Sequence, residues 1–182
     1  MRTSFAPSSG CAAWLPWLIS GVQIMVAIPI VAQAMGSIPS GLFILTTGRG
    51  DEATGLLTSF VQQAGFDPLA VTVAIQRKRD VAGLIRKEKA FCLSILRRES
   101  KQILAHFARG FEGGEPAFGG LSIELCDLGI PYLSAAHGHL VCELIGESTW
   151  TDHVLFCAKV IGGACHGDGE PWIHLRKSGL SY

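Results

Sequence analysis

Hydrophobic and polar positions follow two different patterns along the chain, and the change falls at Gly36. Between Arg2 and Arg49 the sequence contains no Asp, Glu, Lys or Arg, and the first part of this stretch is mostly apolar. From Gly36 onward, short apolar runs alternate with turns rich in Gly, Pro and Asp. Apolar runs bounded by such turns are typical of strands. We therefore expect an apolar N-terminal extension over 1–35 and one folded domain over 36–182.

The apolar stretch over residues 11–35 has three interpretations. It is long enough for a membrane-spanning helix, which needs about 20 apolar residues, although its two prolines would each remove a helix hydrogen bond. It also resembles a secretory signal, because Arg2 precedes it and Ala-Gln-Ala at 32–34 has the form of a cleavage site. The third interpretation is a short helix over 30–35 that packs on the domain. Membrane anchoring or export through this stretch stays open, while a cytoplasmic location is favoured.

The pattern after Gly36 predicts six or seven short strands and two small helices. Asp80 and Ser100 each precede apolar positions at helical spacing and offer a side-chain oxygen that can cap a helix. The expected strands cover residues 42–47, 54–62, 69–75, 91–96, 140–145, 154–161 and 172–175. Short strands with few helices indicate a mainly β fold, an antiparallel β-barrel with short peripheral helices.

Composition narrows the classes of function. The formal net charge is zero and the pI is near 7.0, which argues against nucleic acid as a partner. The six cysteines contain no C-x-x-C pair and the six histidines have no helical metal-binding spacing, so we expect no metal. No nucleophile elbow, no P-loop and no dinucleotide fingerprint after a strand is present. Chemistry is therefore expected to come from a cofactor.

Three cations form a basic turn between the strand that ends near residue 75 and the helix that begins near Asp80. Arg77, Lys78 and Arg79 would lie beside free helix N–H groups, an arrangement that suits a phosphate. Such runs are also common as solvated surface turns. His153 and His174 stand at the ends of expected strands, where either a functional or a structural hydrogen-bonding role is consistent with the sequence.

Several motifs occur in a fixed order along the chain. They are Ile38-Pro39-Ser40-Gly41, Ile44-Leu45-Thr46-Thr47, Phe66-Asp67-Pro68, His106-Phe107 before a glycine-rich loop, Asp152-His153, and His174-x-Arg176 close to Tyr182. Taken in order, these motifs resemble the flavin-reductase-like FMN-binding split-barrel family, and especially the flavin reductase module at the C-terminus of cyanobacterial flavodiiron proteins. Thr151 and Leu69 depart from the family pattern, which has glycine and proline there.

The resemblance implies a homodimeric, antiparallel split β-barrel that binds FMN at the subunit interface and takes electrons from NADH or NADPH. By the same resemblance, His153 faces the flavin and nicotinamide, and Arg77 and Arg79 hold the phosphate. The residues implied to line the flavin are Thr58, Ser59, Phe60, Val61, Gln62 and Gln63, and those near the cofactor pocket are His174, Arg176 and Tyr182.

The expected function is that of an NAD(P)H-dependent flavin reductase. One alternative is a non-catalytic FMN-binding electron relay, tethered to a membrane through the N-terminal segment. A second alternative is a structural barrel without flavin. The hydride chemistry itself would belong to the cofactor, so the protein would need only to bind and align.

Overall fold

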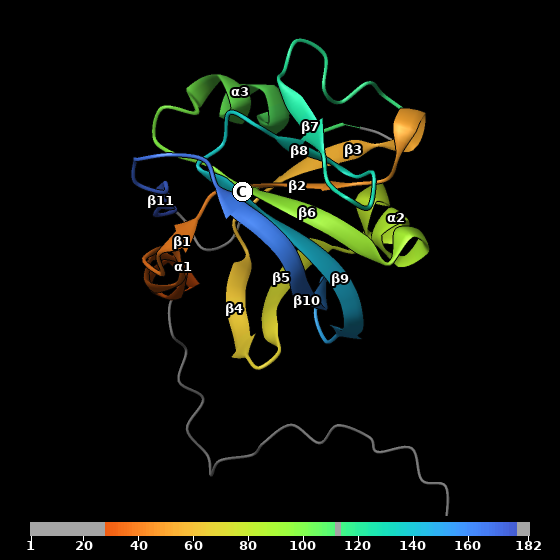
Figure 1. The fold of residues 1–182 in the computed structure, drawn as a ribbon. Coiled ribbons are helices and arrows are strands. Elements are labelled where there is room, and N and C mark those ends of the chain that lie inside the picture. Colours follow the sequence, from red (N-terminus) through yellow and green to blue (C-terminus); the bar gives the residue numbers. More distant parts are fainter. Residues whose placement is uncertain (1–27, 112–113, 178–182) are drawn as a thin grey trace, which may run out of the picture.

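The computed structural model describes residues 28–111 and 114–177, and the fold is mainly β, as the sequence predicts (Figure 1). A seven-stranded sheet dominates it, and every strand pair in this sheet is antiparallel. In spatial order its strands are β3 (Thr54–Thr58), β2 (Phe43–Thr47), β6 (Ala90–Ile95), β9 (Gly138–Thr149), β10 (His153–Cys165), β5 (Leu69–Gln76) and β4 (Val61–Phe66).

The two edge strands of this sheet, β3 and β4, are consecutive in the sequence. The prediction of one strand over 54–62 was wrong, because the chain leaves β3 at Ser59 and Phe60 before it enters β4. Thr58 and Ser59 are both buried, so the alternation of a regular strand is broken there. The chain thus crosses directly from one edge of the curved sheet to the other, which gives a barrel with a split.

Two smaller sheets complete the β structure. β1 (Ser40–Gly41) pairs with β11 (Ile173–His174), and β7 (Ile123–Leu125) pairs with β8 (Pro131–Leu133). The β7–β8 hairpin was not predicted from the sequence. The antiparallel pair β9 and β10 extends well beyond the apolar runs that indicated it, with two bulges in its register.

The predicted helices are confirmed as α2 (Asp80–Glu88) and α3 (Lys101–Ala108). The prediction that Asp80 caps the first helix was wrong, because Asp80 is the first residue of α2 and Arg79 is its N-cap. Ser100 is the N-cap of α3, as predicted, but neither Arg79 nor Ser100 makes a capping hydrogen bond with its side chain. Instead, Ser100 Oγ accepts a hydrogen bond from the Arg97 N–H, 3.3 Å away. A short 3₁₀ helix, η1 (Gly50–Glu52), follows β2.

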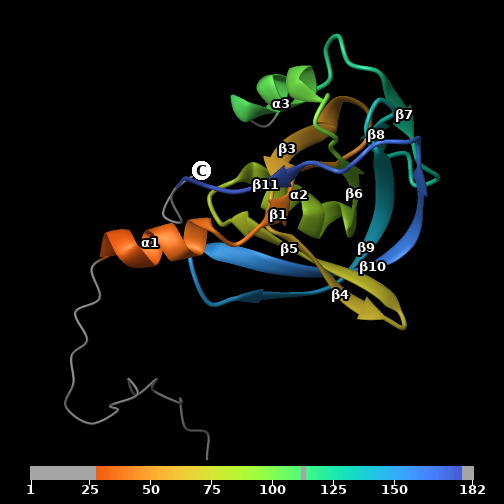
Figure 2. The same cartoon turned by 90° about the vertical axis from the view of Figure 1, so that its left-hand side faces the viewer.

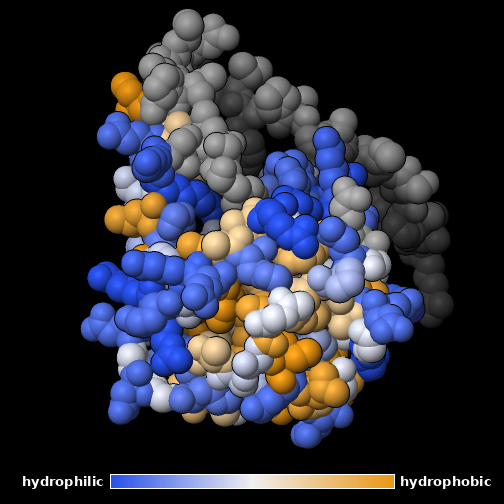
Figure 3. Space-filling model, turned by 90° about the horizontal axis from the view of Figure 1, so that it is seen from above, coloured by the Kyte–Doolittle hydropathy of each residue, from blue (hydrophilic) through white to orange (hydrophobic). Residues whose placement is uncertain are grey.

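The two helices pack on opposite faces of the sheet. Ile85 of α2 belongs to the main core with Leu45 and Phe156, whereas Phe107 of α3 packs with Ile44 in a second cluster. Adjacent β2 residues point to opposite faces, which explains the division. Seen from the side of α3 and the β7–β8 hairpin, apolar side chains occupy the middle of the surface with charged and polar residues around them (Figure 3).

A third helix, α1 (Ile28–Gly36), includes the short helix expected over 30–35 and projects from the molecule beside β1 and β11 (Figure 2). Ala32 is buried, whereas Ile30 and Met35 are exposed. The Arg176 N–H donates a hydrogen bond to the Gly36 carbonyl, 3.0 Å away. Most of the expected membrane or signal segment lies outside the described residues, and within those residues no helix has the length and apolarity to span a bilayer.

Candidate functional site

A groove of about 580 Å³ lies where β3 ends at the split of the barrel, and we call it the main groove. It combines segments that are far apart in the sequence: the end of β3, the end of β5, one side of α3 and the chain around β11. Five of the predicted site residues line it: Thr58, Ser59, Arg79, His174 and Arg176. Leu57, Phe107 and Trp172 add apolar walls. The mixture of apolar walls and a few convergent polar groups is typical of a site for a small organic ligand.

Arg176 connects the two sides of the main groove. Its Nη2 donates a hydrogen bond to Ser59 Oγ, and its Cζ lies 4.0 Å from the centroid of the Phe60 ring. Ser59 and Phe60 are the two residues that join β3 to β4. The guanidinium therefore fixes the crossing point of the barrel through a hydrogen bond and a cation–π contact.

His153 also contacts Phe60. The two rings meet edge to face with centroids 5.6 Å apart. His153 Nδ1 is 2.8 Å from Asp152 Oδ1, and this hydrogen bond lowers the pKa of the Asp152 carboxyl. When Nδ1–H donates to the carboxylate, the neutral ring carries its lone pair on Nε2. Asp152 thus orients the imidazole, and its own carbonyl accepts a hydrogen bond from the Arg77 N–H, 3.0 Å away.

A second depression of about 720 Å³, which we call the basic hollow, adjoins the main groove. Arg77, Lys78 and Arg79 line it together with the first turn of α2. Arg79 and Leu56 line both depressions, so the two lie next to each other. Cations beside the N-terminus of a helix form a favourable environment for a phosphate group.

Gly110 lies close to the Arg79 side chain and leaves room for it beside the two depressions. The residue has φ +76°, and a Cβ added to it would lie 3.3 Å from Arg79 Nη1. A side chain there would therefore crowd the guanidinium as well as strain the backbone.

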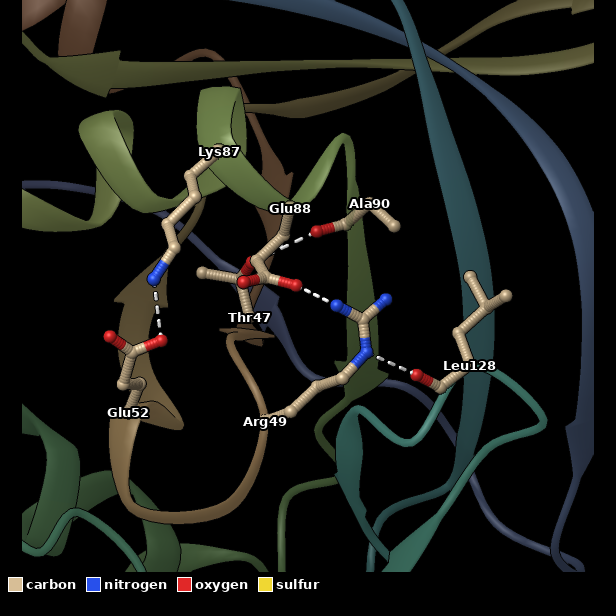
Figure 4. A network of polar contacts seen from close by, with 7 residues as sticks. All are labelled: Thr47, Arg49, Glu52, Lys87, Glu88, Ala90 and Leu128. Carbon is tan, nitrogen blue, oxygen red and sulfur yellow. Dashed lines mark hydrogen bonds and ion pairs between the residues drawn. The ribbon is translucent and has the colours of Figure 1, made fainter.

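The far end of α2 is anchored by a polar network (Figure 4). Arg49 forms an ion pair with Glu88 and donates from Nε to the Leu128 carbonyl, 2.6 Å away. Lys87 Nζ lies 2.6 Å from a carboxylate oxygen of Glu52. These contacts hold the C-terminal end of the helix whose N-terminal end carries the basic turn.

Besides Phe60, Arg77 and His153, four of the predicted site residues do not line the main groove or lie outside the described residues. Val61 is 8% exposed and its side chain packs in the main core, so only its backbone could face a ligand. Gln62 and Gln63 are exposed on the edge strand β4. Tyr182 lies outside the described residues. The roles of all four stay predictions.

Sequence reasoning did not single out Trp172 or Phe107 as walls of the site. Trp172 stands two positions before His174 in the same extended segment, and this proximity was the available signal. Phe107 was placed on the apolar face of its helix, and its place at the groove depends on the packing of α3 against β3. A Cβ on Gly55 would lie only 2.5 Å from the Phe107 ring, so the close approach of α3 to β3 requires glycine there.

Comparison with known proteins agrees with the fold. Residues 35–179 match the family model described as the flavin reductase like domain. The chain therefore belongs to the flavin reductase-like family, which confirms the resemblance noted in the sequence.

The curated relatives include two cyanobacterial proteins that match most of this chain. Diflavin flavoprotein A 1 of Synechocystis is 33% identical over 152 residues, covering 82% of this chain and 26% of the relative. Putative diflavin flavoprotein A 2 of Nostoc is 31% identical over 152 residues, with coverages of 82% and 26%. The chain thus spans about a quarter of the length of these relatives.

Solved structures share the fold. The NADH:FAD oxidoreductase SgcE6 of Streptomyces globisporus superposes with a TM-score of 0.73 at 22% identity, covering 81% of this chain and 86% of that one. The styrene monooxygenase flavin reductase SMOB of Pseudomonas putida superposes with a TM-score of 0.69 at 21% identity, with coverages of 80% and 92%.

Proposed function

We propose that this domain binds FMN in the main groove and acts as an NAD(P)H-dependent flavin reductase. The observation that carries the proposal is that one groove unites the buried hydroxyls of Thr58 and Ser59 with Arg79, although they come from different elements. The family supports a flavin ligand, and the name of SgcE6 pairs NADH with a flavin in that protein.

The residues present fit a phosphorylated flavin. In the proposal, Arg77 and Arg79 hold the phosphate at the N-terminus of α2, where guanidinium forks and helix N–H groups favour an anion. Thr58 and Ser59 supply hydroxyl donors at the polar edge of the ring system, and Phe107 and Trp172 cover its apolar faces.

The protein's part in the reaction is binding and alignment. Bound flavin supplies the capacity to accept a hydride from reduced nicotinamide. Phe60 in the crossing segment and His153 beside it would position the nicotinamide, and Asp152 keeps the imidazole oriented. Holding the two reactants in register accounts for much of the lowering of the barrier, and no general base is needed.

We also propose that two copies of the chain assemble around the edge strand β4. Phe66 is 86% exposed and Leu69 is 57% exposed at the β4–β5 turn, and Ile161 on the adjacent β10 is exposed too. An edge strand with exposed apolar side chains favours pairing with another surface. This assembly would also give Gln62 and Gln63 a place beside a ligand. Sedimentation of the wild-type chain and of the Phe66→Asp variant, with Trp150→Asp as an exposed aromatic control, tests the proposal.

The decisive experiment mixes the purified full chain with FMN, FAD or riboflavin and adds NADH or NADPH under anaerobic conditions. Loss of the flavin absorbance supports the reductase and identifies both preferred nucleotides. Protein that keeps its flavin oxidised indicates the electron relay, and protein that retains no flavin indicates the structural barrel.

We also propose a cytoplasmic location. Fractionation of cells that contain the tagged full chain tests it, and recovery of the protein in the carbonate-resistant membrane pellet would contradict it.

A further inference from the structure

Cys92 and Cys126 meet on the face of the sheet that the β7–β8 hairpin covers. Cys92 lies in β6 and belongs to a small core cluster with Ile130, Tyr132 and Val141. Cys126 follows β7 directly in the turn of the hairpin, and its sulfur is 3.6 Å from that of Cys92. Neither cysteine lines the main groove or the basic hollow, so the flavin proposal does not use them.

The two thiols differ in their access to solvent. Cys92 is fully buried, and this burial raises the pKa of its thiol. Cys126 is partly exposed. A dissolved oxidant therefore reaches Cys126 first, while Cys92 is already in contact with the sulfur that would be oxidised.

A disulfide between these cysteines requires the two sulfurs to approach further. A disulfide bond is about 2.05 Å long, so the two atoms must close by about 1.5 Å. Cys92 is held in the middle of the sheet between β2 and β9. Cys126 opens a tight turn, in which its carbonyl accepts a hydrogen bond from the Gly129 N–H, 2.8 Å away. A turn at the end of a three-residue strand can adjust, whereas the central strand stays in place.

We propose that Cys92 and Cys126 form a reversible intramolecular disulfide when the protein meets a hydroperoxide. The Cys126 sulfur attacks one oxygen of hydrogen peroxide, the O–O bond breaks, and Cys126 sulfenic acid and one water form. The Cys92 sulfur then attacks the Cys126 sulfur while the Cys92 proton passes to the oxygen of the sulfenic acid. The S–O bond breaks as the S–S bond forms, and the oxygen leaves as a second water. Two thiols are oxidised, one peroxide is reduced, and a dithiol reverses the change.

The bond would tie the hairpin covalently to the sheet. Thr46 Oγ1 already donates to the Pro131 carbonyl, and the Leu133 N–H donates to Ser94 Oγ at 3.0 Å. The loop closed by the disulfide contains α3, whose Phe107 lines the main groove. Restricting a loop of this length in the unfolded chain stabilises the folded state, and we expect the Tm to rise by roughly 5–15 °C.

The test treats the reduced full chain with a slight excess of hydrogen peroxide, quenches it in denaturant with an alkylating reagent, and maps the peptides by mass spectrometry. We expect Cys92 and Cys126 to be recovered as one linked pair that has lost two hydrogens, and as two alkylated thiols after dithiothreitol. Oxidation of the protein in denaturant should instead give mixed pairs, because the selection depends on the fold.

Variants separate this pair from other thiols. Cys126→Ser should leave Cys92 alkylated after peroxide and abolish the rise in Tm, whereas Cys165→Ser, at an exposed position, should retain both effects. The proposal is overturned if Cys126 of the wild-type chain is converted to sulfinic acid while Cys92 remains a thiol. It is equally overturned if Cys126 links to Cys165 or to a second chain. The wild-type map decides the matter even if a variant does not fold.

Discussion

The guanidinium carbon of Arg176 lies 4.0 Å from the centre of the Phe60 ring. The same side chain donates a hydrogen bond to Ser59, which stands 117 positions earlier in the sequence. Arg176 follows β11, and Phe60 lies between the two edge strands of the barrel. The C-terminal segment therefore closes over the split at the point where the barrel would otherwise open.

We predict that Arg176→Met weakens flavin binding by about 5- to 30-fold, because the hydrogen bond and the cation–π contact together contribute about 1–2 kcal/mol. Methionine keeps much of the apolar stem. Titration of the protein with flavin, followed by fluorescence, measures the change. Arg98→Met, at an exposed position that lines neither depression, serves as control and should bind normally. Equal affinity in both variants would remove Arg176 from the site.

Reversing the charge of Arg77 and Arg79 together should release FMN. Each charge-assisted contact to a phosphate is worth about 1.5–3 kcal/mol, so affinity should fall at least 100-fold. Riboflavin, which has no phosphate, should lose much less. Lys101→Glu is the matched charge reversal, since Lys101 is exposed and lines neither depression. Unchanged FMN affinity in the double variant would show that the phosphate is bound elsewhere.

Gly110→Ala should reduce flavin affinity, because Gly110 lines the main groove and the new methyl group would also crowd Arg79. Gly110 and Gly120 have the same φ of +76°, but only at Gly110 would the new methyl group meet Arg79 Nη1, at 3.3 Å. At Gly120 a Cβ would meet nothing within 4 Å. Both variants should lose about 1–2 kcal/mol of stability from backbone strain. A loss of flavin affinity in Gly120→Ala equal to that in Gly110→Ala would contradict a local effect at the main groove.

Arg49→Met should destabilise the fold more than Lys87→Met. The Glu88 side chain that Arg49 pairs with is only 8% exposed, whereas the Glu52 side chain paired with Lys87 is 63% exposed. Removing Arg49 leaves a largely buried carboxylate without its ion pair, at a cost of about 1–3 kcal/mol. Removing Lys87 should cost less than about 1 kcal/mol. Urea denaturation gives both free energies of unfolding, and similar values would refute the ranking.

The sequence predicts the segment from β5 to α2 well. Alternating apolar residues over 69–75, a charged turn and a helical pattern after Asp80 are all local signals, and each appears in the structure close to its predicted bounds. The position of Arg79 beside the basic hollow follows from the same local order, because Arg79 directly precedes the first residue of α2.

Other features depend on distant contacts and carry no local signal. The break at Ser59 and Phe60 has no Gly or Pro, and it arises because the chain must cross between the edges of the barrel. The β7–β8 hairpin is short and half its residues are exposed, so its apolar pattern is weak. The hydrogen bond between Arg176 and Ser59 depends on the β1–β11 pair, which brings the segment that follows β11 back to the split of the barrel.

Arg79 and Leu56 belong to both depressions, so a single arginine borders two compartments. An anion held in one compartment neutralises part of the positive potential that a second anion would feel in the other, and added salt weakens both attractions. Two small anions would therefore bind with mutual antagonism. One elongated anion that extends past Arg79 would be attracted in both compartments at once. The affinity of this surface should therefore depend on the length of its ligand.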